Sequence, residues 1–168
     1  GINTRMIYLL YDDGSRSEKV ILNELGGCKG IIQSDGYSPY RKLESDAYPH
    51  ITRIPCLQHI KRKFIDCGED EPDAKRIVEL INTLYQNEHK HKIGVDGWTV
   101  EQNLVHRKKY APDILGEIKD VLDDIEERGD LLPKSELKEA VTYLRNEWNA
   151  VVDIFNYGDT YLDNNIVE

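Results

Sequence analysis

The chain has no apolar run that approaches the roughly 18–20 residues needed to cross a bilayer, so no membrane partner is expected. Its 168 residues include only three cysteines, Cys28, Cys56 and Cys67, and none of them forms a CxxC pair. An odd number without that spacing argues against a disulfide framework and favours reduced thiols in a cytoplasm. Internal repeats and low-complexity segments are also absent. We therefore expect a cytoplasmic protein with an ordinary globular core.

Positive charge is scarce, because 22 Lys and Arg residues stand against 31 Asp and Glu residues, which gives a net charge of -9. This balance argues against a protein that coats DNA along its whole surface. It does not exclude a DNA enzyme whose basic residues are concentrated on one face. The length and the 39% hydrophobic content suit one domain, or one domain with an insertion.

The first part of the chain, residues 1–67, alternates between strand and helix patterns. Apolar runs rich in strand-forming residues occur at residues 6–11, 29–34 and 51–55. Helices are expected at about residues 15–25, 37–43 and 56–67. Alternation of this kind predicts parallel strands, so the fold class is an α-rich α/β protein with a core of three strands.

The second part, residues 68–157, shows helical patterns only. Apolar residues there step by three or four, most clearly Leu137, Val141, Leu144, Trp148, Val151 and Phe155. Pro133 follows two leucines and separates the last two helices. Residues 158–168 then start a new element, a turn that leads into a helix interrupted at Glu168. A domain that ends on an unfinished helical turn suggests an excised piece of a longer protein.

Two acidic residues are candidate metal ligands. Asp35 stands where a predicted strand meets Gly36, and ligands gather at the carboxyl ends of strands in open α/β sheets. The alternative is a turn-forming Asp-Gly pair. Glu168 lies in the first turn of the interrupted helix, where a carboxylate can simply complement the helix dipole. Together the two carboxylates indicate metal-dependent chemistry on nucleic acid.

Residues 56–64, Cys-Leu-Gln-His-Ile-Lys-Arg-Lys-Phe, hold the remaining candidates. Cys56 and His59 form half of a zinc site, but no second half follows at ligand spacing. Lys61, Arg62 and Lys63 are a basic run in an acidic chain. They form either a solvated helix face or a patch that contacts DNA phosphates beside Asp35. Trp98, farther along, is expected to pack in the core or in a loop rather than to stack on a base.

Several segments together resemble one protein family. They comprise residues 11–16 (Tyr-Asp-Asp-Gly-Ser-Arg), 30–40 (Gly-Ile-Ile-Gln-Ser-Asp-Gly-Tyr-Ser-Pro-Tyr), 56–64, 132–144 (Leu-Pro-Lys-Ser-Glu-Leu-Lys-Glu-Ala-Val-Thr-Tyr-Leu), 146–148 (Asn-Glu-Trp) and 162–168 (Leu-Asp-Asn-Asn-Ile-Val-Glu). In this order they resemble the transposases of bacterial insertion sequence family 66. These enzymes belong to the DDE class, named after three catalytic acids, and have a ribonuclease-H-like core.

The resemblance implies a role for each candidate residue. Asp35 matches the second acid of the catalytic triad and Glu168 the third, while Cys56 and His59 match a motif that supports the site. Residues 1–67 would be a partial ribonuclease-H-like core, 68–157 a helical insertion, and 158–168 the return to the core. The first acid would precede residue 1, so the isolated chain is expected to be inactive. Residues 6–11 would pair directly with residues 29–34 or with a second chain, because an unpaired apolar edge invites association.

The resemblance also implies an activity, which is cleavage and transfer of DNA strands during transposition of an insertion sequence. The implied cofactor is Mg²⁺ or Mn²⁺, and the implied partners are the transposon ends, target DNA and further copies of the chain. The implied location is the bacterial cytoplasm, in association with the nucleoid. One alternative is a non-catalytic DNA-binding or assembly module of a transposase or of a domesticated relative. Another is a metal-binding regulatory domain that uses Cys56 and His59.

Overall fold

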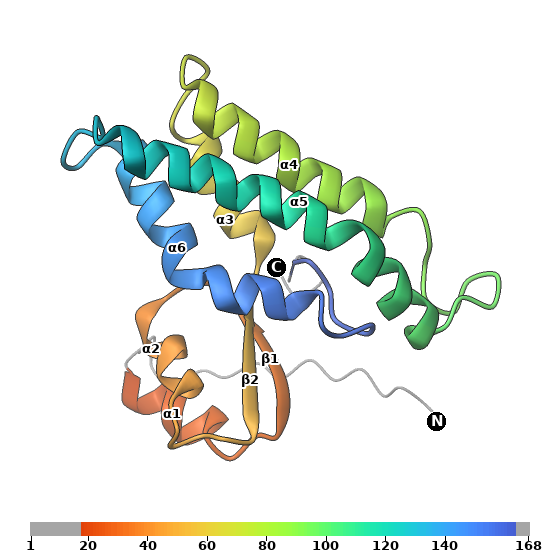
Figure 1. The fold of residues 1–168 in the computed structure, drawn as a ribbon. Coiled ribbons are helices and arrows are strands. Elements are labelled where there is room, and N and C mark those ends of the chain that lie inside the picture. Colours follow the sequence, from red (N-terminus) through yellow and green to blue (C-terminus); the bar gives the residue numbers. More distant parts are fainter. Residues whose placement is uncertain (1–17, 164–168) are drawn as a thin grey trace.

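The computed structural model describes residues 18–163, which form helices and one small sheet (Figure 1). In chain order the elements are α1 (Glu18–Leu25), β1 (Gly30–Ser34), α2 (Ser38–Arg41), the 3-10 helix η1 (Lys42–Glu44), β2 (Ile51–Pro55), α3 (Leu57–Ile65), α4 (Pro72–Glu88), α5 (Val100–Arg128) and α6 (Glu136–Ile154). The predicted α-rich α/β class is confirmed. Across the described residues, no helix is both long and apolar enough to span a bilayer.

The sheet of the described residues has two parallel strands, with Gly30 of β1 opposite Ile51 of β2 and Ser34 opposite Pro55. The expected three-strand ribonuclease-H-like core is therefore not what these residues form. The third strand was placed on residues 6–11, which lie outside the described residues, as does its expected pairing with residues 29–34. Both strands of the sheet were predicted within one residue of their observed bounds.

Local signals in the sequence explain where the long helices begin and end. Thr99 caps α5 through a reciprocal pair of bonds: its Oγ1 accepts from the Gln102 nitrogen at 3.2 Å, and its nitrogen donates to Gln102 Oε1 at 2.9 Å. Gly129 ends α5 in the left-handed conformation with φ 66°, which a glycine adopts without steric cost. Ser135 caps α6 by accepting from the Lys138 nitrogen at 3.2 Å.

The main hydrophobic core joins the four longer helices to the sheet. It contains side chains from α3, α4, α5 and α6, together with Ile54 of β2 and Leu162 near the end of the described chain. The predicted stripe of α6 faces this core, since Leu137, Val141, Leu144 and Val151 are all buried while Trp148 is half-buried. A smaller core of Ile21, Leu43 and Ile51 holds α1 and η1 against the sheet.

Figure 1 shows how these elements are stacked. Helices α4 and α5 run side by side at one end of the molecule, and the two strands lie with α1 and α2 at the other end. Helices α3 and α6 occupy the space between them, and both contact each other and their neighbours in the two layers. The division into residues 1–67, 68–157 and 158–168 stays a prediction. What the packing adds is that α6 lies directly against β2.

Candidate functional site

The carboxyl ends of β1 and β2 meet at one edge of the sheet, and the end of the described chain returns to that edge. The Gln33 side-chain amide donates to the Pro55 carbonyl at 3.2 Å and to the Tyr161 carbonyl at 2.9 Å. The Leu57 nitrogen donates to the Leu162 carbonyl at 2.8 Å. Residues 161–163, which we call the return segment, are thus fastened beside the strand ends by two backbone carbonyls.

Asp35 lies at this edge, immediately after β1, and is half-buried. Its Oδ1 accepts from the Tyr37 nitrogen at 3.1 Å, and its backbone carbonyl accepts from the Arg53 guanidinium at 3.3 Å. Of the cationic side chains in the described part, none forms an ion pair with the Asp35 carboxylate. The turn role expected of an Asp-Gly pair is therefore present, and the carboxylate also keeps acceptor capacity for a cation.

The turn that follows Asp35 rests on helix α6. The Tyr143 hydroxyl accepts a hydrogen bond from the Gly36 nitrogen at 2.8 Å. A Cβ atom at position 36 would lie 2.3 Å from that hydroxyl, so only glycine fits under the tyrosine. Burial raises the pKa of Tyr143, and the nearby carboxylates of Glu147 and Asp35 raise it further. The phenol therefore stays neutral and holds the turn by a hydrogen bond rather than by charge.

A buried group of four charged residues lies behind this turn. Arg53 of β2 forms close ion pairs with Glu147 of α6 and with Glu44 of η1, and its side chain and that of Glu147 are fully buried. Arg41 Nε lies 2.8 Å from the second Glu147 oxygen. Burial alone would lower the pKa of Arg53, but the hydrogen bonds and charges of the two glutamates raise it on balance. The network ties α2, η1, β2 and α6 together beneath Asp35.

The other side of the edge holds Cys56, Tyr85 and the return segment. Cys56 is buried at the start of α3, and its nitrogen extends the ladder by donating to the Ser34 carbonyl at 3.1 Å. Burial raises the pKa of Tyr85 of α4 well above its ordinary range, and the charge and hydrogen bond of Asp163 add to the rise. Asp163 therefore lies beside Tyr85 at the sheet edge, five positions before Glu168.

The basic run of α3 does not form a single stripe. The ammonium nitrogen of Lys61 lies 6.0 Å from the centre of the Tyr85 ring, and that of Lys63 lies 6.0 Å from the centre of the Tyr143 ring. Arg62, between them, is exposed. The two lysines therefore flank the edge, one on the side of the return segment and the other on the side of the Asp35 turn.

The structure places the other predicted residues less directly. His59 is half-buried one turn after Cys56 on α3. Among residues 18–163, no cluster of three or more His, Cys, Asp or Glu side chains could hold a metal ion, so nothing there completes a zinc site around Cys56 and His59. Glu168 lies outside the described residues. Its proposed place at the edge follows from the position of the return segment.

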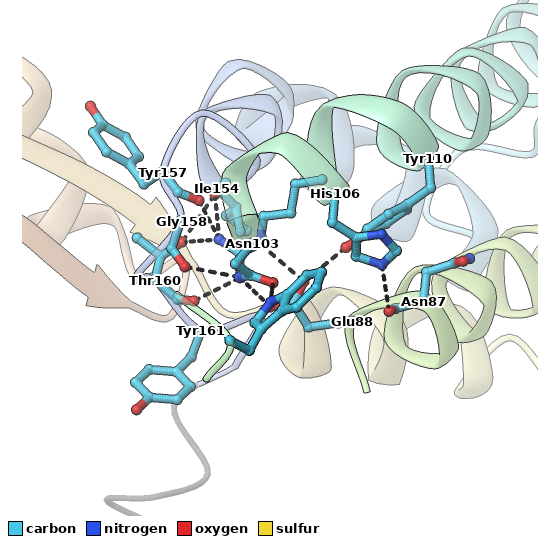
Figure 2. Close-up of polar contacts among 12 residues, drawn as sticks. Asn87, Glu88, Asn103, His106, Tyr110, Ile154, Tyr157, Gly158, Thr160 and Tyr161 are labelled. Atoms are coloured by element: carbon cyan, nitrogen blue, oxygen red, sulfur yellow. Dashed lines mark hydrogen bonds and ion pairs between the residues drawn. The ribbon is translucent and has the colours of Figure 1, made fainter. Parts of the chain in front are cut away.

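The return segment is held from behind by Arg107, a fully buried residue of α5. Its guanidinium donates to three backbone carbonyls, those of Ile154 at 3.2 Å, Tyr157 at 2.5 Å and Thr160 at 2.7 Å. Its Nε also donates to Glu88 Oε2 at 3.0 Å. Figure 2 shows Glu88, Tyr157 and Thr160 converging on this point. Burial would raise the pKa of Glu88, but the hydrogen bonds and charge of Arg107 lower it on balance.

Four of these positioning residues were not predicted. Arg53 interrupts an apolar strand, which is a readable sign of a buried charge with a partner. Glu147 falls three positions after Leu144 and so lies on the buried face of α6, but the apolar stripe was drawn through Trp148 instead. Arg107 carries no such sign, because it sits in a basic run that is typical of a solvated helix face. Tyr143 is one of ten tyrosines, and nothing in its neighbourhood distinguishes it.

Comparisons with known proteins identify the family. A family model described as "Transposase IS66 family" matches residues 2–168. The uncharacterized protein y4jD of Sinorhizobium fredii (strain NBRC 101917 / NGR234) is 28% identical over 161 residues, which cover 92% of this chain and 30% of that protein. The uncharacterized protein y4qI of the same organism is 26% identical over 176 residues, covering 100% of this chain and 31% of that protein.

The chain thus spans a little under a third of the length of the curated relatives it matches. No solved structure matches it. The family model, in contrast, covers nearly every residue, including both strand ends, the α3 motif and the return segment. The chain belongs to the IS66 family of transposases.

Proposed function

We propose that this chain is the part of a DNA transposase that supplies Asp35 and Glu168 to a divalent-metal site for DNA strand cleavage and strand transfer. The observation that carries the proposal is the return of residues 161–163 to the edge where Asp35 stands, although more than 120 residues separate them in sequence. Its partners would be the transposon ends and target DNA, within an assembly of several copies of the transposase.

The donors at the edge suit Mg²⁺ or Mn²⁺. Asp35 offers a half-buried carboxylate that pairs with no cation of the described residues, and Glu168 would add a second from the segment that follows Asp163. Both donors are hard oxygen atoms, which these ions prefer, and Mg²⁺ keeps several water molecules, so two or three carboxylates suffice. When bound, such ions activate a water or a DNA 3′-hydroxyl and stabilise the leaving oxygen at phosphorus.

The surrounding residues would hold these carboxylates in place. Tyr143 and the Arg53–Glu147 pair fix the backbone on either side of Asp35. Arg107 fixes the backbone just before the return segment, and so restricts where the residues after Asp163 can go. Lys61 and Lys63 flank the edge and would contact the DNA phosphates, while Cys56 and His59 support the start of α3 next to it.

The test is DNA strand cleavage by a transposase that contains this chain, in Mg²⁺ or Mn²⁺. Asp35→Asn and Glu168→Gln should each reduce cleavage to background, while Glu139→Gln, at an exposed position on α6, should leave it unchanged. Cleavage that survives both changes would contradict the proposal and favour a non-catalytic module. DNA binding by that module should weaken on neutralising Lys61, Arg62 and Lys63.

The same assay applied to the 168-residue chain tests the missing first acid. We expect no turnover from it, because only two of the three expected carboxylates are present. Robust turnover that Asp35→Ala abolishes would show instead that this chain carries a complete site.

A further inference from the structure

A second candidate site lies where the α4–α5 loop meets the first turns of α5. Three of the exposed large hydrophobic residues of the described chain gather there: Ile93 is 43% exposed, Val95 49% and Val105 56%. Trp98, at the same place, is only half-buried and is not part of either hydrophobic core. The expectation that Trp98 packs in a loop holds only in part, because much of this loop is open to solvent.

The rings around Trp98 leave part of it available to a ligand. His91 stacks on Trp98 with ring centres 3.8 Å apart and planes 13° apart, and His106 meets it edge-on at 6.1 Å. A cavity of about 330 Å³ opens beside the indole. It is lined by Trp98, Glu101, Gln102, Val105, His106 and Lys109. His91 does not line this cavity, so it leaves uncovered the part of the indole that faces it.

The charge of this region is opposite to that of the whole chain. Residues 89–109 contain five Lys and Arg residues against two Asp and Glu residues, as well as three of the five histidines, in a chain of net charge -9. Lys90, Lys92 and Lys109 are exposed, and Lys109 borders the cavity. A flat aromatic surface with exposed ammonium groups around it matches a nucleic-acid strand, whose bases stack and whose phosphates are anionic.

We propose that this surface, the Trp98 site, binds an unpaired DNA segment, with one base stacked on Trp98 in the cavity and its phosphates near Lys90, Lys92 and Lys109. A duplex keeps its bases stacked inward, so only an unpaired base can enter the cavity. The choice of DNA rests on the proposed function; the stacking and the charge do not.

The Trp98 site is connected to the return segment through one buried residue. Asn103, which is 2% exposed, accepts from the Trp98 indole nitrogen at 3.4 Å and donates to the Gly158 carbonyl at 2.9 Å. Figure 2 shows Asn103 facing Gly158 and Thr160, on the loop that leads to the return segment. A strand bound at Trp98 is therefore held at a fixed place relative to the loop that leads back to the Asp35 edge.

The experiment measures binding of the 168-residue chain to a fluorescein-labelled oligothymidylate and to a labelled hairpin duplex, by fluorescence anisotropy at several salt concentrations. Trp98→Ala should weaken oligothymidylate binding by about 5- to 150-fold, the equivalent of about 1–3 kcal/mol for one stacked base. Trp98→Phe should retain most of the affinity. Trp148→Phe, a half-buried tryptophan on α6, is the matched control and should change nothing.

The lysines are tested by the salt dependence. Lys90→Gln and Lys92→Gln should each reduce the slope of log K against log salt by about 0.7, the value for one phosphate contact on a single strand. An unchanged thermal unfolding midpoint shows that each variant is folded. Equal affinity of the wild-type chain and Trp98→Ala for the oligothymidylate would overturn the inference, as would no binding at low salt.

Two further results would also overturn it. One is a preference for the duplex that does not depend on Trp98. The other is self-association, measured by analytical ultracentrifugation, that Val105→Asp abolishes, because a second copy would then cover the surface. Neither result touches the cleavage test with Asp35→Asn, so this inference and the proposed function fail separately.

Discussion

The Tyr143 hydroxyl lies 2.8 Å from the Gly36 nitrogen and joins the third-last turn of α6 to the residue after Asp35. The two residues are 107 positions apart, so the helical part of the chain determines the backbone conformation at the candidate site. The buried Arg53–Glu147 pair makes the same connection a few ångströms deeper. A helix that the resemblance assigns to an insertion is thus also the support of the Asp35 turn.

Gly36→Ala tests the closeness of this contact. The new Cβ would lie 2.3 Å from the Tyr143 hydroxyl and 2.5 Å from two ring carbons, so the side chain or the turn has to move. We expect the free energy of unfolding in urea to fall by about 1–3 kcal/mol, as for other overpacked sites. In a Tyr143→Ala background the same change should cost much less. Equal costs in both backgrounds would show that the two residues do not press on each other.

Glu147→Ala tests the buried ion network. The change leaves the Arg53 guanidinium buried without its main partner, which typically costs about 3–5 kcal/mol of unfolding free energy. Glu139→Ala removes an exposed carboxylate from the same helix and should change stability by no more than about 0.5 kcal/mol. Comparable losses in the two variants would contradict the assignment of Glu147 as a buried ionic partner.

Glu88 predicts a pH dependence of stability. Arg107 holds the folded-state pKa of Glu88 below its ordinary value of 4.5, so the contribution of Glu88 to stability is complete above that pH. This contribution is lost as the pH falls through the lowered pKa. Glu88→Gln should therefore be less stable than the parent chain at pH 7, and the difference should narrow below pH 4.5. A difference that stays constant on acidification would show that Arg107 does not depend on the charge of Glu88.

Cys67 predicts a slow thiol reaction. Burial and the charges of Glu136, Glu71 and Asp66 raise the pKa of Cys67 to about 11. In a Cys28→Ser variant, where the other remaining cysteine is buried, the rate of alkylation by iodoacetamide should still rise about tenfold per pH unit between about pH 8 and 10. A rate that levels off near pH 9 would contradict the raised pKa.

The sequence allowed the described elements to be predicted because each signal is local. The strands Gly30–Ser34 and Ile51–Pro55 are short apolar runs between turn residues, and α6 is a long stripe that begins after a capping serine. Such signals depend only on neighbours within a few positions. The pairing of the two strands also followed, since alternating strands and helices favour parallel neighbours.

The supports of the site could not be predicted in the same way, because they depend on contacts between distant residues. Nothing near Tyr143 in the sequence refers to Gly36, and nothing near Arg107 refers to the carbonyls of Tyr157 and Thr160. The basic run was read as one patch, but consecutive helical residues point in directions about 100° apart. Lys61 and Lys63 accordingly face different tyrosines on different helices.

The most direct test of the central claim, that Asp35 and Glu168 share a metal site, is the broadening of amide NMR signals by Mn²⁺ in the ¹⁵N-labelled chain. The signals of Asp35, Gly36 and Asp163 should broaden first, and both Asp35→Asn and Glu168→Gln should raise the Mn²⁺ concentration that is required. Glu139→Gln should have no effect. Broadening centred on another acidic group, or unchanged in either of the two variants, would contradict the shared site.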